Sequence, residues 1–372
     1  MLSLEERERR IKAIREKMEE RGIDVLLVSS SSDLSERGKL RYVSYWTTEL
    51  FDNYVILPKR GEMKYFGHYG LDANLVKEKC RIRETYYPPF GENPGPFIAD
   101  LIRGLVPMRV GLCGTKNLTA SVYRALIENL KGIEIEEATD IIDDLKMVKS
   151  PEELKYVKKV AAMSDFAMDC FKHILKPGKV ERDLIYEVDC EVKKKGVEDS
   201  FYFIGSGKKP PITFPVFTAK KRIKDGDLVL FNAELVGEEG YCTQCVRFFS
   251  VGKPAKEVLE AYEILKVVFE AGRKNLMHGN RICDVANAML DVVKGTGYTM
   301  PIHLGHGQGL DIMERPFPTP EDKTELKTNM TITLHPQVGL PNGIILFVAN
   351  QYVVTAQGGR CLHKTPNEII VV

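Results

Sequence analysis

The spacing of hydrophobic residues in the N-terminal part of the chain predicts alternating helices and strands. Apolar residues recur at helical spacing among the charged residues of segment 5–21, and a glycine follows them. The apolar run IDVLLVSS that comes next predicts a buried strand of the parallel type, and runs at 53–57 and 110–113 predict two more. Together with a helix near 119–130, this alternation predicts an α/β domain.

A new helical pattern begins at Ser150 and marks the start of a second domain. Ser150 can cap the helix, Pro151 suits its first turn, and Glu153 completes a capping box. The helix then presents one apolar face, formed by Val157, Val160, Met163, Ala167, Cys170 and Ile174. We therefore place two domains at residues 1–147 and 148–372.

The second domain is predicted to be organised around the segment Leu228–Phe249. Two β-rich runs in this segment are separated by a turn at Gly237–Gly240, which predicts a β hairpin. Helical patterns follow from Pro254 and over residues 281–294, before a further β-rich stretch. Two helices and a β hairpin thus occur twice, which predicts an α+β architecture with internal two-fold character.

Composition limits the classes of partner. Of the 372 residues, 44% are hydrophobic and 28% are charged, and the net charge of +1 gives no electrostatic reason to expect nucleic acid or an anionic membrane. There is no apolar run of about 18 residues and the N-terminal segment is charged, so we expect a cytoplasmic protein. The eight cysteines are scattered and predicted to be free thiols. Cys242 and Cys245 form a CxxC motif, which can mark a zinc or redox site. Residues three apart in a strand face opposite sides, which argues against such a site here.

Short motifs across the second domain match those of one known family. They are Gly226-Asp227, Gly240-Tyr241, Arg247, the segment HLGHGQGLDIMERP from His303 to Pro316, and the pairs Asn329-Met330 and Val354-Thr355. In these motifs, and in the order of its N-terminal elements, the chain resembles the creatinase, prolidase and aminopeptidase P family. The resemblance implies an α/β N-terminal creatinase-like domain, an α+β pita-bread C-terminal domain and a homodimer.

The resemblance also indicates that the family's metal ligands are missing. The metallopeptidases of the family hold two metal ions, and matching the motifs places Ala233, Gln244, His306, His335 and Ala349 at the ligand positions. Only His306 is a family ligand. Alanines and a neutral amide cannot screen two neighbouring cations, so we expect neither a dinuclear metal site nor another cofactor.

Creatinase, a metal-free member of the family, provides the model for the predicted function. By this resemblance the chain is a metal-independent hydrolase of a C–N bond, amide or amidine, in a small polar metabolite. His306 is the predicted general base, because imidazole titrates near neutral pH. Glu314 would orient it or protonate the leaving nitrogen, and His335 would share the proton transfer or hold a substrate carboxylate. The predicted substrate contacts are Tyr241, Gln244, Arg247, His303 and Phe214, the last in place of a family histidine.

Two other functions fit the same residues. The first is a non-catalytic pita-bread protein that binds a small ligand or a partner, with His306 and His335 retained for packing. The second is an Xaa-Pro-type metallopeptidase with an unusual single metal, held by His306, His335 and the side-chain oxygen of Gln244. Bound metal would distinguish the single-metal peptidase from the other two functions. Catalytic turnover would distinguish the predicted hydrolase from the non-catalytic binding protein.

Overall fold

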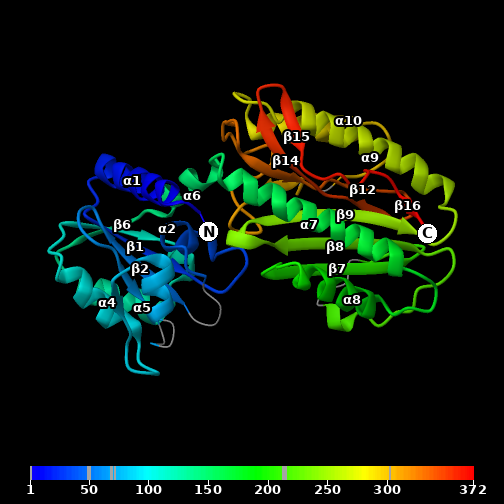
Figure 1. The fold of residues 1–372 in the computed structure, drawn as a ribbon. Helices are drawn as coiled ribbons and strands as arrows, with labels where there is room; N and C mark the ends of the chain where they lie inside the picture. The colour runs from blue at the N-terminus through cyan, green and yellow to red at the C-terminus, as the bar shows by residue number, and fades with distance from the viewer. Residues whose placement is uncertain (1, 48–51, 68–69, 71–72, 212–215, 301–302) are drawn as a thin grey trace. The chain divides into compact units, whose positions relative to one another are not determined.

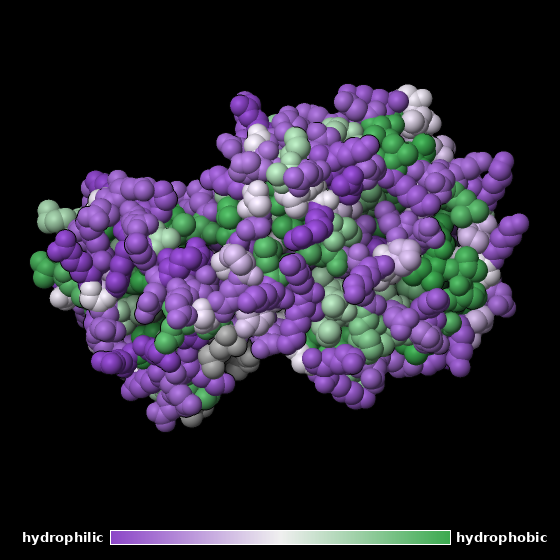
Figure 2. Space-filling model, turned by 45° about the horizontal axis from the view of Figure 1, so that its top comes forward, coloured by the Kyte–Doolittle hydropathy of each residue, from purple (hydrophilic) through white to green (hydrophobic). Residues whose placement is uncertain are grey.

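The computed structural model describes the chain except for residues 1, 48–51, 68–69, 71–72, 212–215 and 301–302. Its contacts divide the chain into two compact units, Met1–Lys146 and Met147–Val372, and each unit is described by itself. In the described part of the chain, none of the helices has the length and apolar character needed to cross a membrane. On the face drawn in Figure 2, hydrophilic residues cover most of the surface, with hydrophobic residues in small groups among them.

The first unit is a six-stranded sheet covered by helices (Figure 1). The strands, in the order β4-β3-β2-β1-β5-β6 across the sheet, are β1 (Val25–Ser30), β2 (Asn53–Pro58), β3 (Lys64–Phe66), β4 (Glu84–Tyr86), β5 (Arg109–Cys113) and β6 (Glu134–Glu137). The helices are α1 (Leu4–Arg21), α2 (Gly38–Ser44), α3 (Ala73–Leu75), α4 (Pro94–Arg103), α5 (Ala120–Asn129) and α6 (Thr139–Met147). The predicted α/β class of this unit is confirmed.

Local sequence signals set the ends of the first elements. Helix α1 begins where the Ser3 side chain accepts a hydrogen bond from the Glu6 N–H, and it ends at Gly22, whose φ of 67° lies in the left-handed region. Strand β1 is buried at every position, as its continuous apolar run predicts. It pairs with β5 in parallel and with β2 in the antiparallel sense, so it forms the centre of the sheet.

The second unit contains two four-stranded sheets and a short hairpin, covered by long helices. One sheet has the order β16-β9-β8-β7, with β7 (Asp199–Gly207), β8 (Leu228–Val236), β9 (Cys242–Ser250) and β16 (Ile370–Val371). The other has the order β10-β11-β14-β15, with β10 (Gly305–Gly307), β11 (Thr331–Leu334), β14 (Asn350–Thr355) and β15 (Gly358–Cys361), while β12 (Gln337–Gly339) pairs with β13 (Ile345–Phe347). The predicted α+β class of this unit is confirmed.

Four helices accompany these strands. They are α7 (Glu153–Ile174), α8 (Glu181–Lys194), α9 (Lys256–Asn275) and α10 (Ile282–Val293). Figure 1 shows α7 lying along β8 and β9, and the two helices α9 and α10 packed side by side. The predicted capping box at the start of α7 is present, because the Ser150 N–H donates to Glu153 (2.7 Å) and the Glu153 N–H donates to the Ser150 hydroxyl (3.1 Å). All eight cysteines are free, as predicted.

Candidate functional site

His306 lies at the centre of β10 in a backbone frame that only glycines permit. A Cβ at Gly305 would lie 2.2 Å from the Thr333 carbonyl oxygen, and one at Gly307 would lie 2.2 Å from the Arg315 carbonyl oxygen. Glycines on both sides therefore let β10 pack closely against β11 and against the segment at Arg315. The close packing leaves the His306 residue only 2% exposed.

The His306 imidazole is neutral and has a defined tautomer. Its Nδ1 lies 2.9 Å from the Gly307 carbonyl oxygen, which can only accept, so Nδ1 carries the proton and Nε2 keeps its lone pair. Burial lowers the pKa of His306 to about 4, although the Gly307 carbonyl and the charge of Glu314 oppose the change. At neutral pH the side chain is thus a proton acceptor.

His335 and His303 lie beside His306, as the sequence predicted for a common site. The ring centre of His335 is 5.1 Å from that of His306 and 4.7 Å from that of His303, and Phe347 packs against it at 5.5 Å. His335 is 3% exposed, and burial, followed by the charges of His306 and His303, lowers its pKa well below the ordinary value. His303 is at the surface, and partial burial lowers its pKa.

Glu314 forms a buried ion pair. Its Oε2 accepts from the Lys149 ammonium (2.9 Å), and its Oε1 accepts from the backbone N–H groups of Leu310 (2.8 Å) and Asp311 (3.1 Å). The Lys149 and Glu314 side chains are 2% and 1% exposed. Because both carboxylate oxygens are occupied and Nδ1 of His306 bonds to a carbonyl, the structure argues against the predicted roles of Glu314. It stabilises the turn that follows β10 instead.

The hairpin β8–β9 corrects one position of the sequence comparison. Gln244 pairs with Glu234, and Ala233 pairs with Cys245. Since side chains alternate along a strand, Glu234 and Asn232 share a face with Gln244, whereas Ala233 points to the opposite side. Gln244 Nε2 donates to Asn232 Oδ1 (3.2 Å) and Glu234 Oε1 (2.9 Å). The expectation that Ala233 is at a ligand position is wrong, and Asn232 occupies that side of the sheet.

Strand pairing brings the hairpin and the histidines to one face of the second unit. His306 pairs with Thr333, and Thr333 pairs with Gln351. A bridge between Val246 and Ala349 connects β9 to the start of β14, which places Gln244 and Gln351 on the same side. We call this surface the polar face, and its residues are Asn232, Glu234, Gln244, His306, Thr333, His335 and Gln351.

The polar face is almost uncharged at neutral pH. Burial raises the pKa of Glu234 to about 8, although hydrogen bonds from Asn232 and Gln244 oppose this change, so the carboxyl is mostly protonated at pH 7. His306 is neutral, and so is His335. A metal ion placed here would meet amides, imidazoles and one protonated carboxyl.

These donors do not fit the metal pair that the family resemblance implies. Two adjacent cations need carboxylates that bridge them and reduce their repulsion. Among the residues that the structure describes, no group of three His, Cys, Asp or Glu side chains is placed to hold a metal ion. The described residues therefore do not fit a dinuclear metal site.

Two predicted substrate contacts have structural roles. The Arg247 guanidinium is fully buried and donates to the carbonyl oxygens of Val246, Ala349, Thr365 and Pro366 and to Asn350 Oδ1, at 2.7 to 2.9 Å. The buried Tyr241 hydroxyl donates to Glu153 (2.8 Å) at the start of α7. Neither donor group is directed at the polar face, so the predicted contacts are wrong. Gln244 lies on the polar face, and Phe214 is outside the described residues.

Sequence reasoning missed five residues of this region, and one of them, Thr333, lies on β11 between His306 and Gln351. Counting residues along the family motif selected Ala233 in place of its neighbours Asn232 and Glu234. Once Glu234 is paired with Gln244, the alternation of side chains along β8 puts Asn232, two residues earlier, on the same face. Gln351 lies two positions after Ala349 on the same face, which was a detectable signal. Lys149 precedes the capping box, and no local pattern indicated its ion pair.

Comparisons with known proteins agree with the fold and with the resemblance. The model of metallopeptidase family M24 matches residues 155–356, and that of the creatinase/prolidase N-terminal domain matches residues 10–148. The Xaa-Pro dipeptidase of Pyrococcus furiosus is 26% identical over 357 residues, which are 95% of this chain and 97% of the relative. An uncharacterized peptidase of Bacillus subtilis is 25% identical over 284 residues, 74% of this chain and 78% of the relative.

Solved structures show the same fold over nearly the whole chain. The Xaa-Pro dipeptidase from Bacillus anthracis gives a TM-score of 0.84 at 22% identity, with 98% of this chain and 100% of that chain covered. The X-Pro aminopeptidase from Thermotoga maritima gives 0.85 at 19% identity, with 97% and 99% covered. With the family model matching more than half of its length, this chain belongs to metallopeptidase family M24 and carries the creatinase/prolidase N-terminal domain.

Proposed function

We propose that the polar face hydrolyses the C–N bond of a small peptide of the Xaa-Pro type, without a dinuclear metal site. The substrate class comes from the names of relatives that match nearly the full length of the chain. Those names favour the Xaa-Pro peptidase alternative over the small polar metabolite that the sequence first indicated. The observation that carries the reaction is His306, a buried neutral imidazole whose Nε2 accepts no hydrogen bond from the residues that the structure describes.

The proposed chemistry needs only proton transfers by imidazole. As the oxygen of a water molecule bonds to the carbonyl carbon of the peptide bond, Nε2 of His306 accepts a proton from that water. The imidazolium then returns the proton to the peptide nitrogen, the C–N bond breaks, and an acid and an amine leave. His335, whose ring centre is 5.1 Å from that of His306, is placed to relay this proton. This hydrolysis consumes one water molecule and involves no change of oxidation state, so it needs no redox partner.

A single-metal peptidase is the second candidate, and one observation favours it. The rings of His303, His306 and His335 lie together, with centres 4.7 to 6.4 Å apart, and imidazole is a good ligand for zinc. In the described geometry these rings do not form a metal-binding group. Rotation of a ring would be needed before three nitrogens could meet at one point.

Metal analysis combined with an activity assay tests both candidates. Purified protein would be incubated with manganese, cobalt or zinc, desalted, and analysed for metal content and for hydrolysis of alanyl-proline with and without EDTA. Hydrolysis that continues in EDTA, by protein with less than about 0.1 metal ion per chain, supports the proposal. Hydrolysis that requires about one ion per chain supports the single-metal peptidase. Failure to hydrolyse any of a panel of Xaa-Pro dipeptides in either state contradicts both and leaves a non-catalytic binding protein.

A further inference from the structure

We propose that the side-chain oxygens of Gln244 and Gln351 form a subsite for a protonated amine, which is the free amino end of the substrate. This inference rests on the proposed function for the identity of the substrate. The subsite lies on the polar face, where Gln244 of β9 and Gln351 of β14 provide neutral acceptors.

The hydrogen bonds of the two amides identify which atom of each is the free acceptor. Gln351 Nε2 donates to the carbonyl oxygen of Cys242 (3.2 Å), which cannot donate, so the other end of the amide is the oxygen. In Gln244 the donor Nε2 bonds to Asn232 Oδ1 and Glu234 Oε1. Neither Oε1 atom receives a hydrogen bond from any residue that the structure describes.

These acceptors are deeply buried. Gln244 is 3% exposed and Gln351 is 0% exposed. A buried carbonyl oxygen without a donor costs about 1–3 kcal/mol, which a fold avoids unless a ligand or water supplies the donor. Two such oxygens on the face that also carries His306 therefore indicate a ligand that brings N–H groups.

The charges around the amides favour a cationic donor. The polar face contains no Lys or Arg, and Arg247 lies on the opposite side of β9, occupied by backbone carbonyls. The nearest acidic group is Glu234, whose carboxyl accepts hydrogen bonds from Asn232 and Gln244 at Oε1. An ammonium group has three N–H donors and one positive charge, which suit amide oxygens and a carboxyl that can ionise. A substrate carboxylate would not donate to either Oε1 atom and would leave both acceptors unsatisfied.

The experiment compares two peptides that differ only in that amine. Binding of alanyl-proline and N-acetyl-alanyl-proline would be measured by calorimetry on the full chain, or as kcat/KM from initial rates where turnover occurs. The variants are Gln351→Leu, which removes one acceptor, and Gln357→Leu, a matched change at an exposed turn. Circular dichroism and thermal unfolding confirm that each variant is folded.

We expect the wild type to prefer the free peptide over the acetylated one by at least about tenfold. Gln351→Leu should reduce this preference to less than about threefold, and Gln357→Leu should leave it unchanged, because only the first removes a contact to the amine. Equal or absent binding of the two peptides by the wild type, or an unchanged preference in Gln351→Leu, would overturn the subsite. Preferential binding without any hydrolysis would keep the subsite and reject the proposed function, so the two failures are distinguishable.

Discussion

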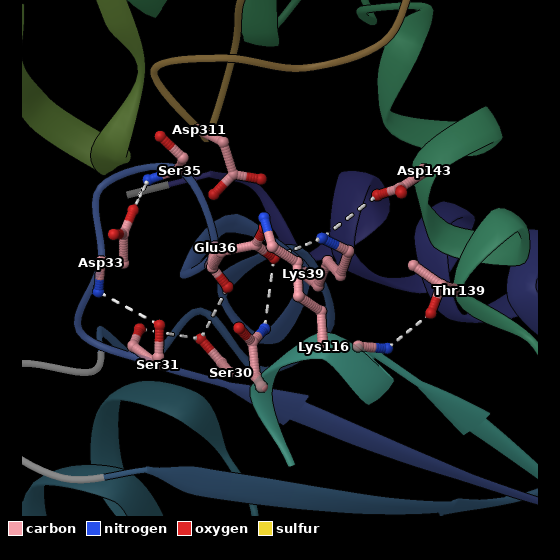
Figure 3. A network of polar contacts seen from close by, with 12 residues as sticks. Ser30, Ser31, Asp33, Ser35, Glu36, Lys39, Lys116, Thr139, Asp143 and Asp311 are labelled. Carbon is pink, nitrogen blue, oxygen red and sulfur yellow. Dashed lines mark hydrogen bonds and ion pairs between the residues drawn. The ribbon is translucent and has the colours of Figure 1, made fainter. Parts of the chain in front are cut away.

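Each unit of the protein contains a glutamate in a polar network, partly buried in the first unit (Glu36) and buried in the second (Glu234), and the two glutamates behave in opposite ways. In the first unit, Glu36 accepts hydrogen bonds from Lys39 (3.2 Å) and Lys116 (2.7 Å), and Lys39 also lies 3.7 Å from Asp143 (Figure 3). In the second unit, the partners of Glu234 among the described residues are the amides of Asn232 and Gln244. One network is built of ion pairs, and the other of neutral groups.

The pKa values record this difference. Burial raises the pKa of Glu36, but the lysines outweigh it and the net pKa is lower than the ordinary value of 4.5. Burial raises the pKa of Glu234 to about 8, because amide hydrogen bonds are too weak to offset the loss of water. In the charged network the lysines neutralise the Glu36 carboxylate, and these ion pairs stabilise a loop of the first unit. The neutral network leaves the buried Oε1 of Gln244 without a donor, which is consistent with the proposed ligand site.

The largest expected effect, on kcat/KM, comes from replacing His306, the imidazole of the neutral polar face. His306→Ala should lower kcat/KM for an Xaa-Pro dipeptide by roughly 100- to 10,000-fold, because it removes the proton acceptor. His173→Ala, at an exposed histidine of α7, is the matched control and should retain full activity. Initial-rate kinetics on both variants make the measurement, and a fully active His306→Ala protein would exclude the proposed role.

The ion pair between Lys149 and Glu314 is the charged exception within the second unit. Lys149→Met should destabilise the protein by about 3–5 kcal/mol, because it leaves the Glu314 carboxylate buried without a countercharge. Adding Glu314→Gln should recover part of that loss by removing the unpaired charge. Urea unfolding at pH 7 measures both variants. A loss below about 1 kcal/mol in the single variant would mean that water reaches the carboxylate.

The two glutamates should respond differently to pH. The native state keeps the Glu234 proton up to about pH 8, whereas an unfolded chain loses it near 4.5. The stability due to this group is therefore complete below pH 4.5 and falls as pH rises towards 8, by up to about 1.4 kcal/mol per pH unit. Glu234→Gln should remove this slope between pH 5.5 and 7.5.

Glu36→Gln is the control for that experiment. Its lowered native pKa gives stability that is present above pH 4.5 and lost as pH falls below it, so the slope between pH 5.5 and 7.5 should not change. Urea unfolding at several pH values measures the slopes. Identical slopes of stability against pH for wild type and Glu234→Gln would show that Glu234 is ionised in the native protein. The two glutamates would then not differ in charge.

The smallest effect concerns the exposed edge of the charged network. The Lys116 side chain is 80% exposed, so Lys116→Ala should cost at most about 1 kcal/mol, and the cost should fall in about 0.5 M salt. Lys39 is 8% exposed, and Lys39→Met should cost more and depend less on salt. Urea unfolding of both variants at two salt concentrations tests this order, and an equal cost would show that exposure does not control the energy of this network.

The fold was largely predictable because its signals are local. The capping box of Ser150 and Glu153 spans three residues, and the glycines beside His306 are its direct neighbours. The site was predictable only in part. The sequence predicted His306, His335 and Gln244, which the structure places on the polar face. It also predicted substrate contacts for Arg247 and Tyr241, whose donors bind other parts of the chain. An arginine that binds carbonyls more than 100 residues away carries no local sign of that role.

By itself the sequence determined the order of the elements and the family, since both follow from residue types at known spacing. Only the tertiary structure decided that Asn232, and not Ala233, shares the face of Gln244, because a shift of one residue in a strand reverses the side to which it points. The tertiary structure also decided the charge of buried carboxyl groups. Glu36 and Glu234 are the same residue type, and the partners that folding brings to each determine whether the carboxyl is ionised.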